Sequence, residues 1–317
     1  MSEENAEREA LVELLKENLR EQRRARRWRL IFRSVVLALV VLGVALLART
    51  GLSPSQDDTG PHTAEVAIKG PIMADSPASA DRVLQGVERA FEADNVEGIV
   101  LRINSPGGSA VQARQIYQEL RRLRETHEDT PVYAVIEDIG ASGAYYVAAG
   151  ADKIFVNESS IVGSIGVIMG GFGFQEAMKK LGIERRLYTA GENKALLDPF
   201  SPEDEAEVEH VQAMVDEIHG QFIAAVRQGR GEAIEAAEVD EERLFSGLVW
   251  TGSRSLELGL ADELGSARSV ARDVIGAEKR VDYTVQGNLV SQFADRFGTA
   301  FGRGVFETLL GLEYQPR

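Results

Sequence analysis

The chain has 317 residues, of which 44% are hydrophobic and 27% charged, and its formal net charge at pH 7 is −15. That length suffices for one large domain or two ordinary ones with a substantial core. The acidic bulk offers no basic face for phosphate, so no nucleic-acid partner is expected. The absence of cysteine excludes disulfides, thiolate catalysis and cysteine-based zinc sites.

The N-terminal part of the chain predicts a charged helix followed by a membrane anchor. Residues 1–29 carry leucines at helical spacing among Glu, Lys and Arg, which predicts a cytoplasmic amphipathic helix. Every residue from Ser34 to Ala48 is apolar, small or hydroxyl-bearing, so residues 30–48 approach the ~20 residues that cross a bilayer. An arginine cluster precedes this span and no Ala-x-Ala cleavage pattern follows it. This favours an uncleaved signal anchor over a buried core helix or a cleaved signal peptide.

The arginine cluster also predicts the topology of the anchor. Arginines next to a transmembrane helix hold that end in the cytoplasm. We therefore expect one pass through the inner (cytoplasmic) membrane, with the remaining chain on the outer, periplasmic or extracellular, face.

A linker over residues 49–63, rich in turn formers, is expected to lead into a folded domain over residues 64–285. Short apolar runs alternate there with segments of helical period, which is typical of right-handed βαβ units and predicts an α/β fold. Strands are expected at residues 64–68, 98–103, 131–136, 153–156, 184–188 and 280–285. Helices are expected at residues 80–94, 110–122, 144–149, 174–181, 201–227, 241–246, 251–258 and 266–275. The helix at 201–227 is expected to take Ser201 as its N-cap and Pro202 as its first residue.

The C-terminal tail, residues 286–317, has an apolar residue at every fourth position. These residues are Leu289, Phe293, Phe297, Phe301, Val305 and Leu309. They predict one face of an amphipathic helix, although three glycines weaken it. A packed or subunit-contacting helix is favoured over a tail that lies on the membrane or covers an active site.

Ser142 is the residue around which a catalytic site is expected. It lies between Ala141 and Gly143, after a strand-like run and before an apolar helix-like run. A strand-to-helix turn of this kind exposes a side chain and leaves the next backbone N–H free at the helix N-terminus. The pattern predicts a serine nucleophile.

A serine nucleophile needs a base, and the chain offers histidine or lysine. No motif surrounds any of the four histidines, although a histidine base is not excluded; they are His62, His127, His210 and His219. Both His62 and His127 are expected in solvent, in the linker and at a helix end. A lysine can serve if burial lowers the pKa of its amine. Lys153 and the Lys179–Lys180 pair suit exposed positions, whereas apolar residues flank the loop of Lys194, which is the better choice.

Five motifs in one order carry a family resemblance. They are Asn104-Ser-Pro-Gly-Gly108, Gly140-Ala-Ser-Gly-Ala-Tyr-Tyr146, Ala151-Asp-Lys-Ile154, Gly163-Ser-Ile-Gly-Val167 and the Lys194 loop followed by Asp198-Pro-Phe-Ser-Pro202. The chain resembles the bacterial signal peptide peptidase A family, membrane-anchored Ser-Lys proteases related in fold to Clp protease and the crotonases. The match spans residues 64–285, and one anchor with one domain corresponds to the short form of the family.

The resemblance implies a Clp/crotonase-like βαβ-repeat core and assigns roles to five residues. Ser142 is implied as nucleophile, Lys194 as general base, and the N–H groups of Gly143 and Gly108 as an oxyanion hole. Ser164 matches a hydroxyl that contacts the lysine ammonium, although a turn-capping serine is an equal alternative. The implied reaction is peptide hydrolysis through an acyl-enzyme, with no metal and no cofactor.

The resemblance also implies partners. They are peptide substrates, such as remnant signal peptides or other hydrophobic segments, the membrane itself, and further copies of the chain in a closed homo-oligomeric ring. In such a ring the lysine can reach the serine of a neighbouring subunit. The rival hypotheses are a crotonase-like acyl-transfer enzyme, disfavoured because CoA esters are cytoplasmic, and a non-catalytic membrane scaffold, disfavoured by the intact site residues.

Overall fold

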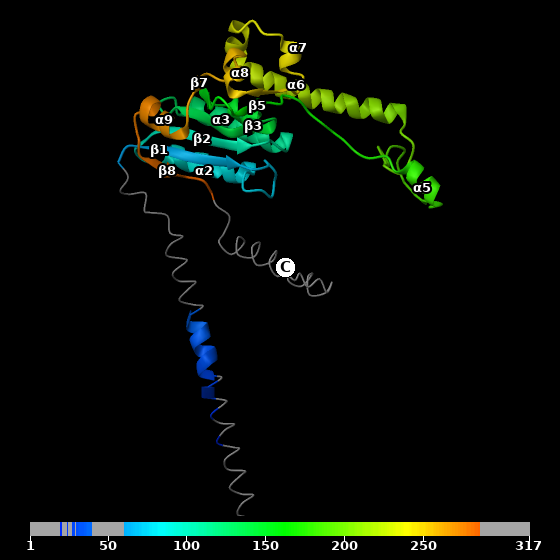
Figure 1. Ribbon diagram of the computed structural model, residues 1–317, viewed down its shortest axis with the longest axis horizontal. Coiled ribbons are helices and arrows are strands. Elements are labelled where there is room, and N and C mark those ends of the chain that lie inside the picture. Colours follow the sequence, from blue (N-terminus) through cyan, green and yellow to red (C-terminus); the bar gives the residue numbers. More distant parts are fainter. Residues whose placement is uncertain (1–19, 21–23, 25–26, 29, 40–59, 286–317) are drawn as a thin grey trace, which may run out of the picture. The chain divides into compact units, whose positions relative to one another are not determined.

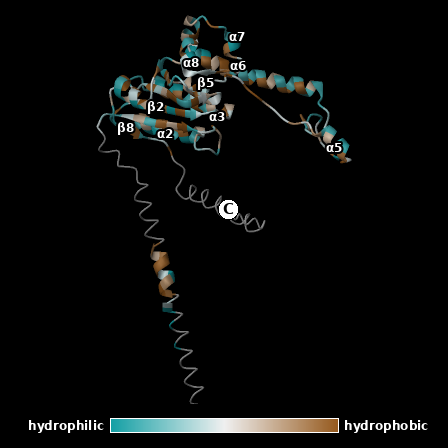
Figure 2. Cartoon of the chain, in the orientation of Figure 1, coloured by the Kyte–Doolittle hydropathy of each residue, from teal (hydrophilic) through white to brown (hydrophobic). Residues whose placement is uncertain are grey.

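The computed structural model describes residues 20, 24, 27, 28, 30–39 and 60–285. The chain divides into two units, residues 1–58 and 59–317. In the first unit residues 30–39 are helical and mostly hydrophobic (Figure 2). Their apolar side chains are exposed. Among the described residues no helix is both long and apolar enough to cross a membrane. Residues 40–48 of the expected anchor, most of the helix expected at 1–29 and the tail at 286–317 lie outside the described residues.

The second unit is built on a sheet to which eight described strands contribute (Figure 1). The strands are β1 (His62–Lys69), β2 (Val96–Ser105), β3 (Val132–Ala141), β4 (Lys153–Val156), β5 (Ile161–Gly163), β6 (Val249–Thr251), β7 (Glu263–Leu264) and β8 (Arg280–Asp282). Their main order is β6-β5-β3-β2-β1-β8, with β4 paired to β3 and β7. Every pair is parallel except β5 with β6. The α/β architecture expected from the alternation of apolar runs is therefore confirmed.

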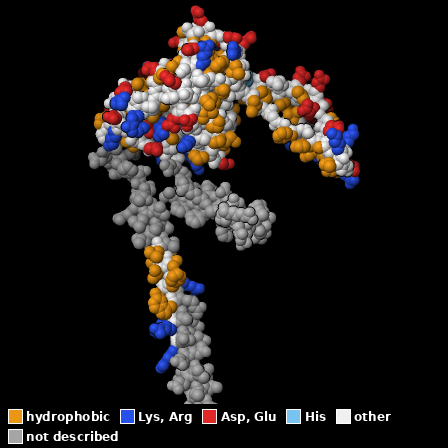
Figure 3. All heavy atoms as spheres, in the orientation of Figure 1, with side chains coloured by type: hydrophobic (Ala, Val, Ile, Leu, Met, Phe, Trp, Pro, Cys, Tyr) orange, Lys and Arg blue, Asp and Glu red, His pale blue; other side chains and the backbone are white. Residues whose placement is uncertain are grey.

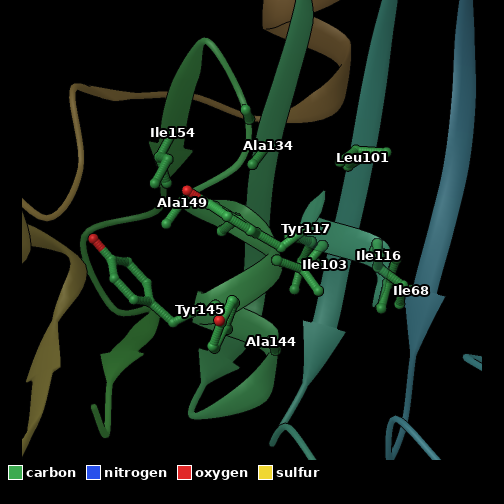
Figure 4. Packing of buried hydrophobic residues seen from close by; sticks show 14 of the residues in the cluster. Ile68, Leu101, Ile103, Ile116, Tyr117, Ala134, Ala144, Tyr145, Ala149 and Ile154 are labelled. Atoms are coloured by element: carbon green, nitrogen blue, oxygen red, sulfur yellow. The ribbon is translucent and has the colours of Figure 1, made fainter. Parts of the chain in front are cut away.

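Helices cover both faces of this sheet. They are α2 (Ala80–Glu92), α3 (Ala110–Thr126), α4 (Gly143–Ala148), α5 (Gln175–Leu181), α6 (Glu205–Ala236), α7 (Glu241–Leu244), α8 (Gly252–Glu257) and α9 (Ala267–Ser269), which continues as the π-helix η2 (Val270–Ile275). The main core, between the sheet and α2, α3 and α4, includes Leu101, Ile116 and Tyr145 (Figure 4). A smaller core under α9 and η2 includes Val100 and Phe155. Burial on both faces explains why the strands are almost continuously apolar.

The strand that leads to Ser142 changes partner along its length. The first part of β3 pairs with β4 through Tyr133–Ile136, and its last residues, Ile139–Ala141, pair with β5. Buried Ser160 stabilises this fork, since its Oγ lies 3.1 Å from the carbonyl oxygen of Ile136 and 2.5 Å from that of Glu137. The fork brings the end of β5 beside the residue that follows β3.

The start of the domain differs from the prediction. Strand β1 begins at His62, so the last two residues assigned to the linker belong to the sheet, and His62 is fully buried rather than solvated. The ring of His62 stacks on Tyr283, and its Nε2 lies 3.0 Å from the hydroxyl of that tyrosine. Local sequence could not predict this burial, because the partner of His62, Tyr283, is 221 residues away in the chain.

The bounds of α6 and the strand expected at 184–188 are also corrected. Helix α6 begins after Asp204, whose side chain accepts from the N–H groups of its first turn, because the hydroxyl of Ser201 is bound to Asp198 instead. It continues to Ala236 because Arg230 is buried, with its guanidinium on Gly259 and Asp262. Residues 184–188 form no strand, since no neighbouring strand pairs with them.

Candidate active site

Ser142 occupies the turn between β3 and α4 in a backbone conformation that serine rarely adopts. Its φ is 53° and its ψ is −127°. Two hydrogen bonds hold it: its N–H donates to the carbonyl of Gly163 at 2.8 Å, and its carbonyl accepts from the N–H of Tyr146 at 3.0 Å. Ser142 is half-buried and Gly143 is buried. Rare conformations that the surrounding structure enforces occur preferentially at functional sites.

Two glycine N–H groups lie next to this turn. A Cβ atom built on Gly143 would lie 3.3 Å from the nitrogen of Gly108. One built on Gly107 would lie 2.6 Å from the nitrogen of Gly143 and 2.9 Å from the Cβ of Ser142. Among the described residues, neither Gly108 nor Gly143 donates its N–H to any acceptor. Two such donors beside a hydroxyl are the arrangement that stabilises an oxyanion.

The loop of Gly108 is held by the short segment that follows β1. The N–H of Ile72 donates to the carbonyl of Gly107 at 2.9 Å, and the carbonyl of Ile72 accepts from Ser109 at 2.8 Å. A Cβ atom on Gly108 would come within 2.3 Å of the oxygen of Ile72. Only glycine therefore fits this position without moving the loop.

The substitution Gly108→Ala should therefore displace one of the two N–H groups predicted to form an oxyanion hole. We expect kcat for a fluorogenic peptide to fall by a factor on the order of 10² to 10³, with a smaller change in KM. The matched control is Gly231→Ala in α6, because nothing lies within 4 Å of a Cβ atom there. An unchanged kcat in Gly108→Ala would exclude Gly108 as a donor.

Ser164 lies directly after the residue that binds the turn. Its φ is 51°, and its N–H donates to the carbonyl of Leu248 at 2.7 Å. The preceding Gly163 has φ 100°, and a Cβ atom on it would lie 2.9 Å from the Cδ1 of Trp250. Strands β5 and β6 thus bring Ser164 to the neighbourhood of Ser142. The contribution of Trp250 could not be read from the sequence, where no motif surrounds it.

Lys194 is the predicted base that the structure does not join to Ser142 by any hydrogen bond among the described residues. It belongs to an arm, residues 168–203, that connects the end of β5 to α6. Lys194 is exposed, and no hydrogen bond joins its described side chain to Ser142. For the described residues, the hydrogen bonds, ion pairs and ring contacts of the arm stay within it or reach Glu207 at the start of α6. Helix α5, inside the arm, has no buried residue and lies apart from the sheet (Figure 1).

The arm exposes many apolar side chains. Among the most exposed are Ile168 at 98%, Tyr188 at 90%, Phe172 at 80% and Leu181 at 72%. Figure 3 shows apolar side chains gathered along this part of the molecule. A contiguous apolar surface of this kind is typical of a protein–protein or membrane contact.

Arg185 and Asp198 hold the Lys194 loop in shape. The guanidinium of Arg185 contacts the carboxylate of Asp198, and this hydrogen bond lowers the pKa of Asp198 below its ordinary value. The hydroxyl of Ser201 donates to the same carboxylate at 2.8 Å, and Arg185 lies 5.0 Å from the ring centroid of Phe200. Sequence reasoning missed Arg185, since the residues around it were expected to form a strand.

The histidines fall into two groups. The rings of His62 and His127 are bonded at the start of β1 and the end of α3, and His210 is exposed. His219 is different, because its Nε2 lies 3.1 Å from the carbonyl oxygen of Ile165, one residue after Ser164. No local sequence pattern indicates this proximity, since 54 residues separate the two.

An α/β fold with a turn serine beside unpaired glycine N–H groups is the kind of site that serine hydrolases use. Comparison with known proteins names the family: the model of "Peptidase family S49" matches residues 124–281. A relative from Synechocystis sp., provisionally named a protease, is 31% identical over 231 residues, which are 71% of this chain and 78% of the relative. The chain belongs to peptidase family S49.

Other relatives share only part of their length with this chain. An Enterococcus faecium protein, provisionally named signal peptide peptidase SppA, is 31% identical over 202 residues, covering 64% of this chain and 57% of its own. A Brucella abortus protein named Na(+)/H(+) antiporter NhaA is 45% identical over 190 residues, which are 60% of this chain and 25% of that protein. The chain thus spans about a quarter of the length of the first curated relatives that it matches. The resemblance to the signal peptide peptidase A family is confirmed.

Proposed function

We propose that this chain is a membrane-anchored serine endopeptidase with a Clp/crotonase-like core and a Ser-Lys dyad. The observation that carries the proposal is the positive-φ Ser142, bordered by the unpaired N–H groups of Gly143 and Gly108. Membership in a peptidase family supports peptide hydrolysis over a crotonase-like acyl transfer. It likewise favours an enzyme over a non-catalytic scaffold.

In the proposed reaction the neutral amine of Lys194 removes the proton of the Ser142 hydroxyl. The hydroxyl oxygen attacks the scissile carbonyl, and the oxyanion accepts hydrogen bonds from Gly143 and Gly108. The lysine then protonates the leaving amine, and an acyl-enzyme ester remains on Ser142. Water, deprotonated by Lys194, attacks this ester and releases the second product.

We further propose that Lys194 comes from a neighbouring subunit of a homo-oligomeric ring. Two features support this: among the described residues no hydrogen bond joins Lys194 to Ser142, and the arm that carries the lysine exposes a series of apolar side chains (Figure 3). Docking on a second copy would bury those side chains. It would also bring the amine of Lys194 toward the serine of that copy. Ser164 is proposed to contact that amine.

The proposed location of the enzyme follows from residues 30–48. This segment is proposed as a signal anchor of the inner membrane, with residues 1–29 in the cytoplasm, a linker after it and the catalytic domain on the outer face. The proposed substrates are remnant signal peptides or other hydrophobic peptides near the membrane. Residues 286–317 are proposed as an amphipathic tail.

Labelling with a serine-directed fluorophosphonate tests the proposal. We expect the purified full chain to form one covalent adduct, which mass spectrometry of a digest assigns to the peptide that contains Ser142. The Ser142→Ala variant should take up no label, and Ser159→Ala, which changes an exposed serine in the turn before β5, should be labelled like the wild type. An adduct on another serine would contradict the assignment of the nucleophile.

A further inference from the structure

The segment Gly163–Ile165 is bonded to three different parts of the fold. The carbonyl of Gly163 accepts from the N–H of Ser142 at 2.8 Å, and the N–H of Ser164 donates to Leu248 at 2.7 Å. The third bond joins the carbonyl of Ile165 to the Nε2 of His219 at 3.1 Å. Of these three partners, only His219 acts through a side chain. A substitution can therefore remove this one bond without changing the backbone.

His219 lies in the part of α6 that packs on the catalytic turn. One turn further along α6, the ring of Phe222 stacks on Tyr146 of α4, with the ring centroids 4.7 Å apart. His219 itself is half-buried. Since a carbonyl oxygen only accepts, Nε2 must carry a proton, which both the Nε2–H tautomer and the imidazolium provide.

We propose that His219 is a positioning residue of the active site. Its hydrogen bond fixes the carbonyl of Ile165, and through this segment it fixes the acceptor of the Ser142 N–H and the location of Ser164. Because the backbone of Ser142 is held in a rare conformation by few bonds, a small shift of Gly163 changes where the nucleophile lies. The inference rests on the proposed function for its catalytic meaning.

The same bond also links the serine to the arm that carries Lys194. Helix α6 begins where the arm ends, and its buried C-terminal part is fixed on the core by Arg230. The bond from His219 to Ile165 adds an attachment nearer the arm. His219 thereby connects the segment that orients Ser142 to α6, the helix at which the arm ends.

A role of His219 as general base is the competing possibility. The Nε2 proton is already directed at Ile165, and no described bond joins the imidazole to Ser142. Glutamine distinguishes the two roles, because its amide can donate a hydrogen bond from a similar position but does not act as a base near neutral pH.

The test compares His219→Gln and His219→Leu in the purified full chain in detergent micelles. We expect His219→Leu to lower kcat for a fluorogenic peptide between about tenfold and 100-fold with little change in KM. His219→Gln should retain a kcat within a few-fold of the wild type. The control is His210→Leu, an exposed histidine of the same helix, which should leave kcat unchanged. Hydrogen exchange of the amides of Ser142 and Ser164 should be faster in His219→Leu and close to wild type in His219→Gln.

The proposal is overturned if His219→Leu keeps both the wild-type kcat and the wild-type exchange of these amides. It is also overturned if His219→Gln is as inactive as His219→Leu, a result that would assign proton transfer to the imidazole. If the wild-type chain hydrolyses no peptide, the proposed function fails by itself. The exchange comparison then decides whether His219 holds the segment.

Discussion

Ser142→Ala is expected to abolish peptide hydrolysis, with kcat reduced by a factor on the order of 10⁶. The substitution removes the oxygen proposed to attack the scissile carbonyl. In the same proposal the N–H groups of Gly143 and Gly108 bind the carbonyl but cannot replace a nucleophile. Alanine tolerates a φ of 53° no better than serine does, so the backbone strain is unchanged. Cleavage of a fluorogenic peptide by the purified full chain measures the loss.

The fold should survive this change. The two bonds that hold the turn use the backbone N–H and carbonyl of residue 142, which alanine retains. We expect the thermal unfolding midpoint to stay close to that of the wild type, and Ser159→Ala should match the wild type in both activity and stability. Residual hydrolysis well above background in Ser142→Ala would require another nucleophile.

Lys194→Met is expected to lower kcat by a factor on the order of 10⁴ to 10⁶. Methionine keeps much of the length and the apolar stem of lysine but has no amine to accept the serine proton. The control is Lys180→Met, which removes an exposed lysine from the same arm. If Lys194→Met kept full activity, the dyad would be wrong, and a histidine base would have to be considered again.

Mixing the two inactive variants tests where the lysine comes from. When Ser142→Ala and Lys194→Met subunits are co-expressed, an active site needs an intact serine on one subunit and an intact lysine on its neighbour. In a closed ring with head-to-tail contacts, random equal mixing makes roughly a quarter of the sites complete, and about that share of wild-type activity should return. No recovery in verified mixed oligomers would place the dyad within one chain.

Local sequence patterns were sufficient to predict most of the core. The runs that became β2, β3 and β4 are apolar because both faces of the sheet are covered, and this property is visible in any single strand. The turn at Ser142 could be predicted for a similar reason, since a small hydroxyl residue and a glycine stand between a strand pattern and a helix pattern. Gly108 and Gly163 belonged to motifs whose glycines the tertiary contacts then explained.

Features that depend on distant partners could not be predicted from local pattern. The burial of His62 needs Tyr283, the length of α6 needs Gly259 and Asp262, and the strand expected at 184–188 lacked a neighbour. A strand or a buried polar group is stable only when such partners complete its hydrogen bonds. Sequence spacing does not report them.

The sequence by itself predicted the turn at Ser142, the glycine that follows it and the membrane anchor, because each of these predictions depends on residues adjacent in the chain. Only the tertiary structure decided that Lys194 is exposed on an arm, with no hydrogen bond to Ser142 among the described residues, and that His219 bonds to Ile165. The physical reason is that the relation between two side chains depends on how the elements between them pack. A stretch of 52 residues can bring a lysine to a serine or carry it away to a neighbouring subunit.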